Sequence, residues 1–358
     1  MKDPLLPGPF ERWTQRLVAR FVGKAWYDTM LHGQRPEGGA TVFVGLHRNG
    51  AIDGYVHLCA LGGDIVFLVA AGLRRNPLTR LLAVGIPVER AKDKQDRSGN
   101  PAALEAAARW VAGGGQLFVY PEGTSTLGPD VLPFQPGAAR IIGLTLELGV
   151  VPRLVAVGID YARPEIPGSI ADVLIGKAIV LDGLPEQRED RVTEIQARIT
   201  SALRALVYRF TDDVAQSAAR YAAEIEAAGD RPRRLELLRR PPPAALPARP
   251  PGSPLASVVL GLGILANPLP AVTIAFAPNL LADDRNVVAF WQIVPTVLTA
   301  PLWLTLCGIA ALIAFGPAGL LVPVVQAVFG LAALRAAARA FPPRKPPTKP
   351  ELEPPSSA

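Results

Sequence analysis

The chain of 358 residues is 49% hydrophobic and only 19% charged, with a mean hydropathy of +0.25. Its length suggests about two domains at ~150 residues each, and so apolar a composition points to contact with a membrane. The formal net charge of +6 suits an anionic membrane surface or substrate better than nucleic acid. The two cysteines, Cys59 and Cys307, lie far apart, which excludes a disulfide framework and a cysteine-rich metal site.

An amphipathic helix is predicted at the start of the chain, in a first segment that we assign to residues 1–35. From Phe10 to Leu31, apolar side chains recur every three or four residues and basic side chains follow along the flank. Such a helix lies either in a lipid interface or on a protein core with a solvated basic edge, and both interpretations stay open. The first residues lack the apolar core and cleavage site of a secretory signal.

Residues 36–240 alternate between strand and helix patterns, which predicts an α/β domain. Short apolar runs rich in β-branched residues predict strands at 41–46, 65–70, 85–88, 116–120, 154–159 and 173–181. Helices are predicted at 101–112 and 136–148, and one or two amphipathic helices at 188–225. Strands that alternate with helices form a largely parallel sheet with helices on both faces.

A membrane-embedded block is predicted at residues 255–341, after a stiff proline-rich linker at 241–254. No charged residue occurs at 255–282 or at 287–334, and a helix needs ~20 apolar residues to cross a bilayer. The fold class is therefore α/β with a C-terminal transmembrane or re-entrant helical hairpin. Residues 342–358 are predicted to be a disordered tail.

Prolines and basic residues predict how this block is arranged. We expect the first apolar run to break at Asn267–Pro270, as a re-entrant or kinked segment, and the second to divide into two helices at Gly316–Pro317. Arginine and lysine residues lie on both flanks of the block. By the positive-inside rule, both flanks are cytoplasmic and the number of crossings is even. The predicted location is the cell membrane, with the α/β domain on the cytoplasmic side.

A histidine and an aspartate, His47 and Asp53, follow the first strand of the α/β domain. Ligands bind at the carboxyl ends of strands in such sheets. An aspartate that holds one ring nitrogen of a histidine leaves the other nitrogen free to act as a general base. An exposed histidine beside a helix-capping aspartate is an equally open alternative. The nearby His57 is expected to be a hydrogen-bonded helix residue instead of a catalyst.

Two further strand ends carry polar residues. After the strand at 116–120, Pro121, Glu122 and Gly123 predict a tight turn that presents a carboxylate and backbone N–H groups at the sheet edge, with Thr124 following. A turn alone does not require a glutamate between proline and glycine. Basic residues follow the strand at 85–88 and either bind a phosphate or form a solvated cluster; they are Arg90, Lys92 and Lys94.

In their order along the chain, these segments resemble the four motif blocks of the glycerolipid acyltransferases, which are membrane enzymes that acylate glycerol-3-phosphate or lysophosphatidic acid. The resemblance covers about residues 40–182 and rests on His47 to Asp53, Arg90, Tyr120 to Thr124 and Val151 to Gly158. The sequence departs from the family pattern twice. Five residues instead of the usual four separate His47 from Asp53, and Ser125 stands where the family often has an arginine.

The resemblance implies an O-acyltransferase of phospholipid synthesis, in which Asp53 orients His47 and His47 takes the proton from an acceptor hydroxyl. It also implies that Arg90 holds the acceptor phosphate and that Glu122, Gly123 and Thr124 shape the acceptor pocket. The acyl donor is acyl-CoA or acyl carrier protein, a co-substrate, so we expect no separate cofactor and no metal. Expected partners are the donor and membrane lipids, not nucleic acid. A non-catalytic lipid-binding or membrane-scaffold protein on the same fold is the alternative.

Overall fold

The computed structural model describes residues 4–75, 83–89, 100–243 and 245–346. In this part of the chain, seven strands form one sheet in the order β1-β7-β6-β2-β5-β3-β4. The strands are β1 (Asp28–His32), β2 (Thr41–Gly45), β3 (Ile65–Ala70), β4 (Ile86–Val88), β5 (Gln116–Val119), β6 (Arg153–Tyr161) and β7 (Ile170–Ile179). Every pairing is parallel except that of β6 with β7. The predicted largely parallel sheet is confirmed.

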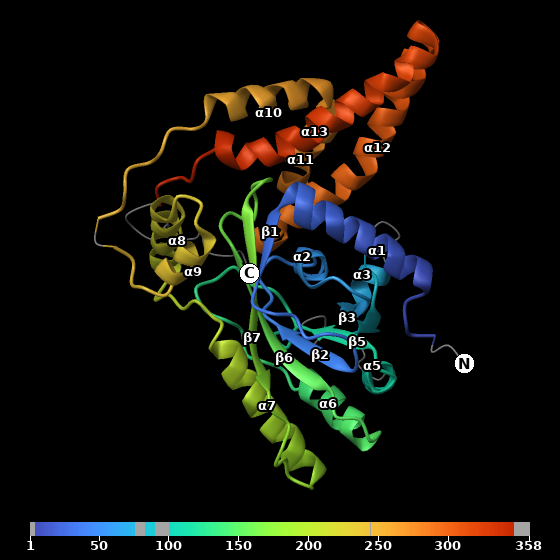
Figure 1. Cartoon of the computed structure of the whole chain (residues 1–358), viewed down its shortest axis with the longest axis vertical. Coiled ribbons are helices and arrows are strands. Elements are labelled where there is room, and N and C mark those ends of the chain that lie inside the picture. The colour runs from blue at the N-terminus through green and yellow to red at the C-terminus, as the bar shows by residue number, and fades with distance from the viewer. Residues whose placement is uncertain (1–3, 76–82, 90–99, 244, 347–358) are drawn as a thin grey trace.

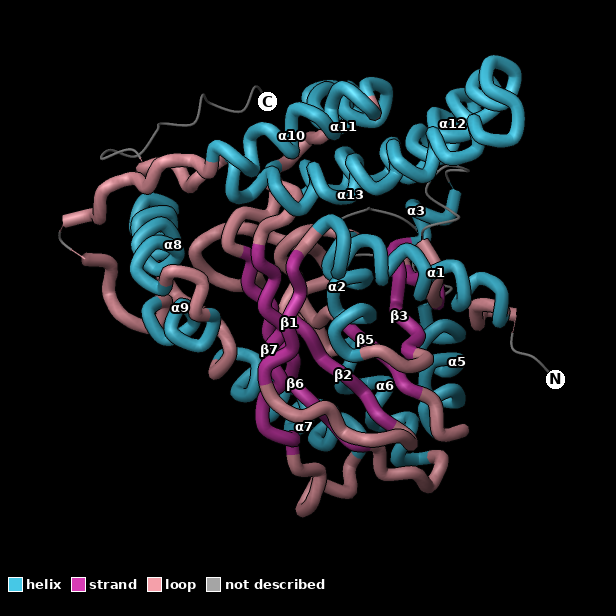
Figure 2. The backbone as a smooth tube through the Cα atoms, turned by 45° about the horizontal axis from the view of Figure 1, so that its top comes forward, coloured by secondary structure: helices cyan, strands magenta, loops and turns pink. Residues whose placement is uncertain are grey.

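Helices cover both faces of the sheet because the direction of the connections reverses (Figures 1 and 2). The chain moves towards β4 from β2 and then returns to β6. Right-handed crossovers place the helices of these two halves on opposite faces. The helices of the domain are α1 (Pro9–Phe21), α2 (Ile52–Leu61), α3 (Ala71–Arg75), α5 (Asn100–Ala112), α6 (Gly137–Glu147), α7 (Arg188–Arg204), α8 (Asp213–Ala227) and α9 (Arg231–Leu237).

The N-terminal helix ends earlier than the sequence pattern predicts. After α1, a π-helical turn runs from Val22 to Trp26, and the chain then becomes extended as β1. The prediction of helix through Leu31 is therefore wrong in its last turn. Trp26 and Tyr27 are completely buried, and burying both beside the sheet draws the chain out of the helix. The apolar face of α1 points outwards, where Phe10 is 73% exposed.

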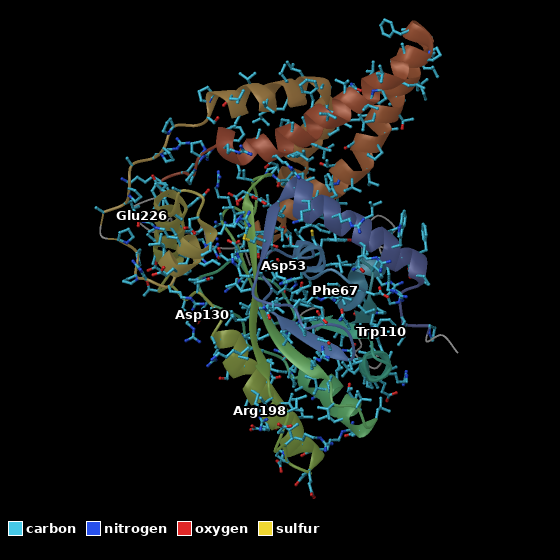
Figure 3. The ribbon with its side chains drawn as sticks, in the orientation of Figure 1. Asp53, Phe67, Trp110, Asp130, Arg198 and Glu226 are labelled. Carbon is cyan, nitrogen blue, oxygen red and sulfur yellow. The ribbon has the colours of Figure 1, made fainter. Side chains whose placement is uncertain are left out.

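The central strands are buried on both faces and form the core of the domain. All five residues of β2 and all four residues of β5 are buried. Phe67 on β3 and Asp53 on α2 lie inside this domain (Figure 3). Because the parallel strands end together, the loops after β2 and β5 meet at one edge of the sheet.

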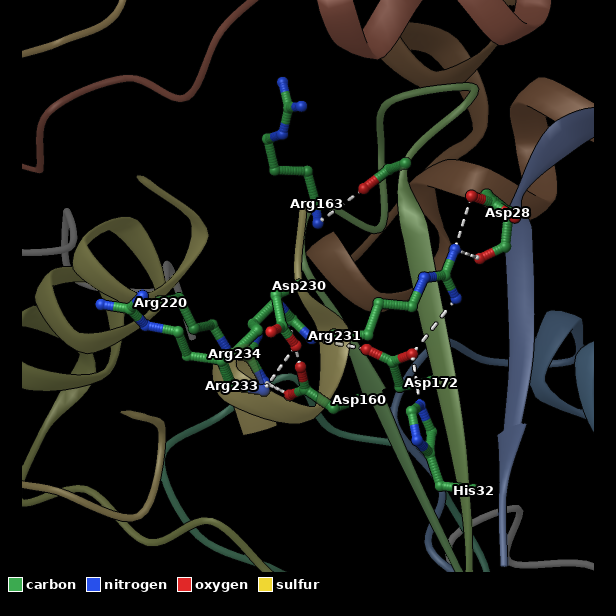
Figure 4. Close-up of polar contacts among 11 residues, drawn as sticks. Asp28, His32, Asp160, Arg163, Asp172, Arg220, Asp230, Arg231, Arg233 and Arg234 are labelled. Atoms are coloured by element: carbon green, nitrogen blue, oxygen red, sulfur yellow. Dashed lines mark hydrogen bonds and ion pairs between the residues drawn. The ribbon is translucent and has the colours of Figure 1, made fainter. Parts of the chain in front are cut away.

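Buried ion pairs attach α9 to the antiparallel pair of strands (Figure 4). The guanidinium of Arg234 contacts Asp160 on β6 and lies 2.9 Å from Asp172 on β7. His32 on β1 also contacts Asp172, at 2.9 Å from its Nε2. The side chains of Arg234, Asp160 and Asp172 are at most 2% exposed. Charges that are this buried are tolerated only when they are paired.

Four apolar helices form the C-terminal part: α10 (Pro254–Ala266), α11 (Pro268–Leu281), α12 (Val288–Phe315) and α13 (Leu321–Ala340). α10 and α11 meet at an angle of 102°, and a 3₁₀ turn, Gly316–Leu320, separates α12 from α13. Both predicted breaks are confirmed. By length and composition, the apolar helical stretch from Arg285 to Ala340 is sufficient to cross a membrane. The first turns of α12 nevertheless pack into the core of the α/β domain, through Phe290, Ile293 and Val294.

Candidate active site

His47 and Asp53 form a hydrogen-bonded pair at the carboxyl end of β2. The distance from Nδ1 of His47 to Oδ2 of Asp53 is 2.8 Å. Between them, Gly50 adopts a left-handed φ of +55°, which a glycine tolerates without a steric penalty. Ile52, at the position where the family usually has its acid, is 1% exposed and packs into the core. The additional residue in the loop therefore brings Asp53 to His47 in the first turn of α2.

Every contact of Asp53 favours its ionised form. Oδ2 also accepts backbone N–H groups from Arg48 at 2.6 Å and Asn49 at 2.9 Å, and Oδ1 accepts the hydroxyl of Tyr161 at 2.7 Å. Burial raises the pKa of Asp53. The hydrogen bond and charge of His47 and the hydrogen bond from Tyr161 lower it by more than burial raises it, so the net shift is downwards. An ionised carboxylate can only accept, so Nδ1 of His47 carries the proton and Nε2 is left as the basic nitrogen.

Aromatic residues fix the plane of the His47 ring. The ring of Tyr120 stacks on it with centroids 4.2 Å apart and an angle of 18° between the planes. The hydroxyl of Tyr120 lies 2.8 Å from Nδ1 of His57, which is also 2.8 Å from the backbone oxygen of Asp53. His57 is fully buried, and desolvation lowers its pKa to about 4. It is a neutral, hydrogen-bonded helix residue, as the sequence predicts.

Glu122 joins the two loops that meet at this edge. Its Oε1 accepts the backbone N–H of His47 at 2.8 Å, and its Oε2 accepts that of Leu132 at 3.0 Å. Burial raises the pKa of Glu122, while these two N–H groups and the charge of Arg48 act in the opposite direction. The side chain is only 4% exposed. Both carboxylate oxygens are thus engaged by the protein, and Glu122 holds His47 in place without needing a substrate.

A cavity of about 710 Å³ opens beside His47. Tyr120, Gly123 and Thr124 line it near the histidine, and the apolar wall comes mainly from β3 and the residues around β4. This volume lies within the usual range for small-molecule sites, ~300–1,000 Å³. A second cavity, of about 690 Å³, adjoins the first at the loop after β5 and is lined by Glu122, Gly123, Thr124 and Arg140.

Residues from the C-terminal part close the first cavity, a contact that the sequence patterns do not predict. Asp283, Asp284, Asn286, Val287, Phe290 and Trp291 all line the cavity. The side-chain amide of Asn286 donates to the backbone oxygen of Ser125 at 2.8 Å, directly beside the loop that carries Glu122. The polar residues at 283–286 interrupt the apolar runs and are visible in the sequence. They lie so far along the chain from the motifs that the sequence does not connect them with the site.

Of the predicted site residues, the structure brings together His47, Asp53, Glu122, Gly123 and Thr124. Arg90, with Lys92 and Lys94, lies outside the described residues. The strand that precedes Arg90 ends at Val88, which lines both cavities.

Part of the chain is similar to known proteins. Residues 30–155 match the family model Acyltransferase. Among solved structures, the chain is similar to the crystal structure of the 1-acyl-sn-glycerophosphate (LPA) acyltransferase PlsC from Thermotoga maritima, with 18% identity, a TM-score of 0.40, and coverage of 56% of this chain and 82% of that chain. No curated protein matched. The matched residues contain the His47–Asp53 pair and the Glu122 loop, so this part of the chain is similar to acyltransferases.

Proposed function

We propose that this enzyme transfers a fatty acyl group from acyl-CoA or acyl carrier protein to a hydroxyl of a glycerophosphate, either lysophosphatidic acid or glycerol-3-phosphate, at a membrane surface. The observation that carries the proposal is the His47–Asp53 pair, with a distance of 2.8 Å, at the edge of a largely apolar cavity of about 710 Å³. A base beside an apolar cavity is the arrangement that acylation by a long-chain donor requires. A non-catalytic lipid-binding protein would not need this pair.

In the proposed reaction, His47 acts as the general base and no acyl-enzyme forms. Nε2 takes the proton of the acceptor hydroxyl while the oxygen attacks the carbonyl carbon of the thioester. The resulting tetrahedral oxyanion is stabilised by backbone N–H groups. When the C–S bond breaks, the imidazolium returns the proton to the leaving thiolate. Asp53 keeps the ring in the required tautomer and stabilises its positive charge between the two steps.

The two adjoining cavities offer a place for each of the two substrates. We assign the acyl chain to the cavity beside His47, because β3 and α12 supply it with apolar residues such as Phe67 and Phe290. We assign the acceptor phosphate to the end of β4, where Arg90 would hold it and Arg140 lines the neighbouring cavity. Ser125 stands where the family often has an arginine in the loop after β5, so Arg90 would have to bind more of the phosphate charge.

A membrane surface is the proposed place of reaction. Phe10, Trp13 and Leu17 on α1 are each more than half exposed, and most large apolar side chains on α10 to α13 are exposed as well. Hydrocarbon covers such a surface at a lower free energy than water does. Membrane lipids would then be partners of the enzyme as well as its products. The basic flanks of the apolar block favour the cytoplasmic side of the cell membrane.

The proposal can be tested with the purified full-length protein in lipid vesicles. Radiolabelled acyl-CoA and acyl carrier protein are each supplied with lysophosphatidic acid, glycerol-3-phosphate or monoacylglycerol, which has a free hydroxyl but no phosphate. We expect product from one of the two phosphorylated acceptors at a kcat/KM at least tenfold above that for monoacylglycerol. Equal use of monoacylglycerol would refute the glycerophosphate assignment, and no transfer from either donor would refute the thioester assignment.

A further inference from the structure

We propose that the C-terminal helices form two re-entrant hairpins, α10–α11 and α12–α13, which enter one leaflet of the membrane and return to the same side without crossing it. This inference rests on the membrane location in the proposed function and adds the path of the chain. If α10 and α11 together made one crossing, the hinge at 283–286 would lie on the side opposite to the α/β domain.

The two outer ends of the hairpins and the hinge between them lie at the α/β domain. At the outer ends, the backbone N–H of Ser253 donates to the backbone oxygen of Arg339 at 3.0 Å. The side chain of Arg163, in the α/β domain, donates to the backbone oxygen of Ala338 at 2.8 Å. At the centre, Asn286 contacts Ser125 in the active-site loop. The chain therefore leaves the domain, returns to it at the hinge, leaves again and returns again. The turn between α12 and α13 lies far from the sheet (Figures 1 and 2).

The free part of the longer hairpin is much shorter than the whole apolar stretch from Arg285 to Ala340, because the base of the hairpin packs on the α/β domain. In α13, the contact of Arg335 with the oxygen of Lys24 marks where the helix reaches the α/β domain. The segment 321–333 before it is about 20 Å long at 1.5 Å per residue, and the exposed part of α12, 298–315, is about 27 Å long. The hydrocarbon core is ~30 Å thick, or ~40–45 Å with the headgroups. Any tilt shortens the depth that the hairpin reaches.

The turn between α12 and α13 is also unsuited to water on the far side. Residues 315–321 contain no charged or hydrogen-bonding side chain. Phe315, Leu320 and Leu321 are 70%, 55% and 67% exposed. A loop that emerges among the opposite headgroups normally carries polar or interfacial residues. An exposed apolar turn is at its lowest free energy when it ends inside the hydrocarbon.

The bend between α10 and α11 is equipped for an environment without water. Pro268 and Pro270 lack N–H groups, so the helix ladder is interrupted at this point. The backbone oxygen of Ala266 instead accepts the indole N–H of Trp303 at 3.0 Å and the amide of Gln326 at 3.1 Å. The amide of Asn267 in turn donates to the oxygen of Gln326 at 2.9 Å. Non-helical backbone is tolerated at membrane depth only when the protein satisfies it internally, as here.

Helix α1 adds an interfacial element on the same side. The π-helical turn that follows it contacts α13, because the side chain of Arg335 donates to the backbone oxygen of Lys24. The exposed apolar residues of α1, Phe10 and Trp13, are accompanied by basic residues that suit anionic headgroups. Together with the two hairpins, α1 gives the enzyme one membrane-facing side.

Cysteine labelling tests the path of the chain. In full-length protein that carries Cys59→Ala and Cys307→Ala, single cysteines are placed by Ala318→Cys in the turn after α12, by Leu265→Cys near the bend after α10, and by Ser201→Cys on α7 as the exposed control. Each protein is inserted into sealed vesicles of phosphatidylcholine and phosphatidylglycerol. A membrane-impermeant maleimide is added outside the vesicles in one sample and sealed inside them in a second. In a third sample it is added after the vesicles have been dissolved with detergent.

We expect Ser201→Cys to be labelled without detergent, and Ala318→Cys and Leu265→Cys to be labelled at least tenfold less from either side, with full labelling after detergent. Labelling of Ala318→Cys from the side opposite to Ser201→Cys would show a crossing and overturn the proposal. Labelling of Ala318→Cys from the same side would show that the helices lie in water, with the same consequence. Acyl transfer is measured on the same samples. Its loss with unchanged labelling would count against the proposed function and not against the path of the chain.

Discussion

Tyr161 donates a hydrogen bond of 2.7 Å from its hydroxyl to Oδ1 of Asp53, the carboxylate oxygen that does not face His47. Tyr161 lies at the end of β6, in the strand next to β2, and is fully buried. The pair His47–Asp53 is thus extended to a row of three side chains, in which each one fixes the orientation of the next.

Tyr161→Phe should lower kcat about tenfold and leave KM for both substrates nearly unchanged. A hydrogen bond to a charged group contributes ~1.5–3 kcal/mol, and we expect about half of that to be expressed in the transition state, where 1.4 kcal/mol is a factor of ten. Steady-state kinetics of the purified variant measure the effect. A kcat equal to that of the wild type would show that the backbone N–H groups of Arg48 and Asn49 orient Asp53 without help from Tyr161.

Glu122→Ala should reduce both stability and kcat more than Glu122→Gln does. Alanine leaves the buried N–H groups of His47 and Leu132 without their acceptor, at a cost of ~1–3 kcal/mol each. Glutamine retains one carbonyl oxygen and satisfies one of the two. Thermal unfolding and kcat are measured for both variants. If the alanine variant is as stable as the wild type, Glu122 does not hold the loops together.

Arg234→Met should lower the free energy of unfolding by about 3 kcal/mol, because Asp160 and Asp172 would lose the cation that they share and keep only Arg220, Arg231 and His32 as partners. Arg240→Met is the matched control. Arg240 pairs with Glu236 one turn away, but both side chains are more than 60% exposed, so its loss should cost less than ~0.5 kcal/mol. Chemical denaturation in detergent compares the two. Equal effects would mean that the buried network does not stabilise the fold.

Stability should fall in mildly acidic solution because His57 is buried in its neutral form. Its pKa is about 4 in the folded protein and ~6.5 when unfolded. The unfolded state therefore binds a proton first, so the stability due to neutral His57 is complete above pH 6.5 and is lost as the pH falls towards 4. The difference reaches about 3 kcal/mol at pH 4. His57→Gln should flatten the pH dependence of the unfolding free energy by that amount; an unchanged slope would contradict the burial of a neutral His57.

The sequence was sufficient to predict the sheet and most of the site, because both depend on local patterns. Buried parallel strands such as β2 and β5 are continuous apolar runs, and polar residues after such runs meet at one edge of the sheet. This places His47 and Glu122 together even though they lie far apart in the chain. The spacing of His47 and Asp53 departs from the family pattern, but the left-handed Gly50 accommodates the additional residue.

Features that depend on tertiary packing could not be predicted from these patterns. The local pattern predicts helix where β1 forms, because the pairing of β1 with β7 involves residues about 140 positions away and leaves no signal in that pattern. Tyr161 carries no motif and is recognised only by its contact with Asp53. The closing of the cavity by Asn286 and Phe290 depends on the return of the C-terminal part to the domain, which hydropathy does not reveal.

The central claim is that His47 is the base and that Asp53 orients it. The most direct measurement is kcat for acyl transfer by His47→Ala and Asp53→Asn in vesicles, compared with the wild type after each variant has been shown to unfold at a similar temperature. We expect no detectable transfer by His47→Ala and a kcat about two to four decades lower for Asp53→Asn, with little change in KM. Transfer by His47→Ala within tenfold of the wild-type rate would contradict the account.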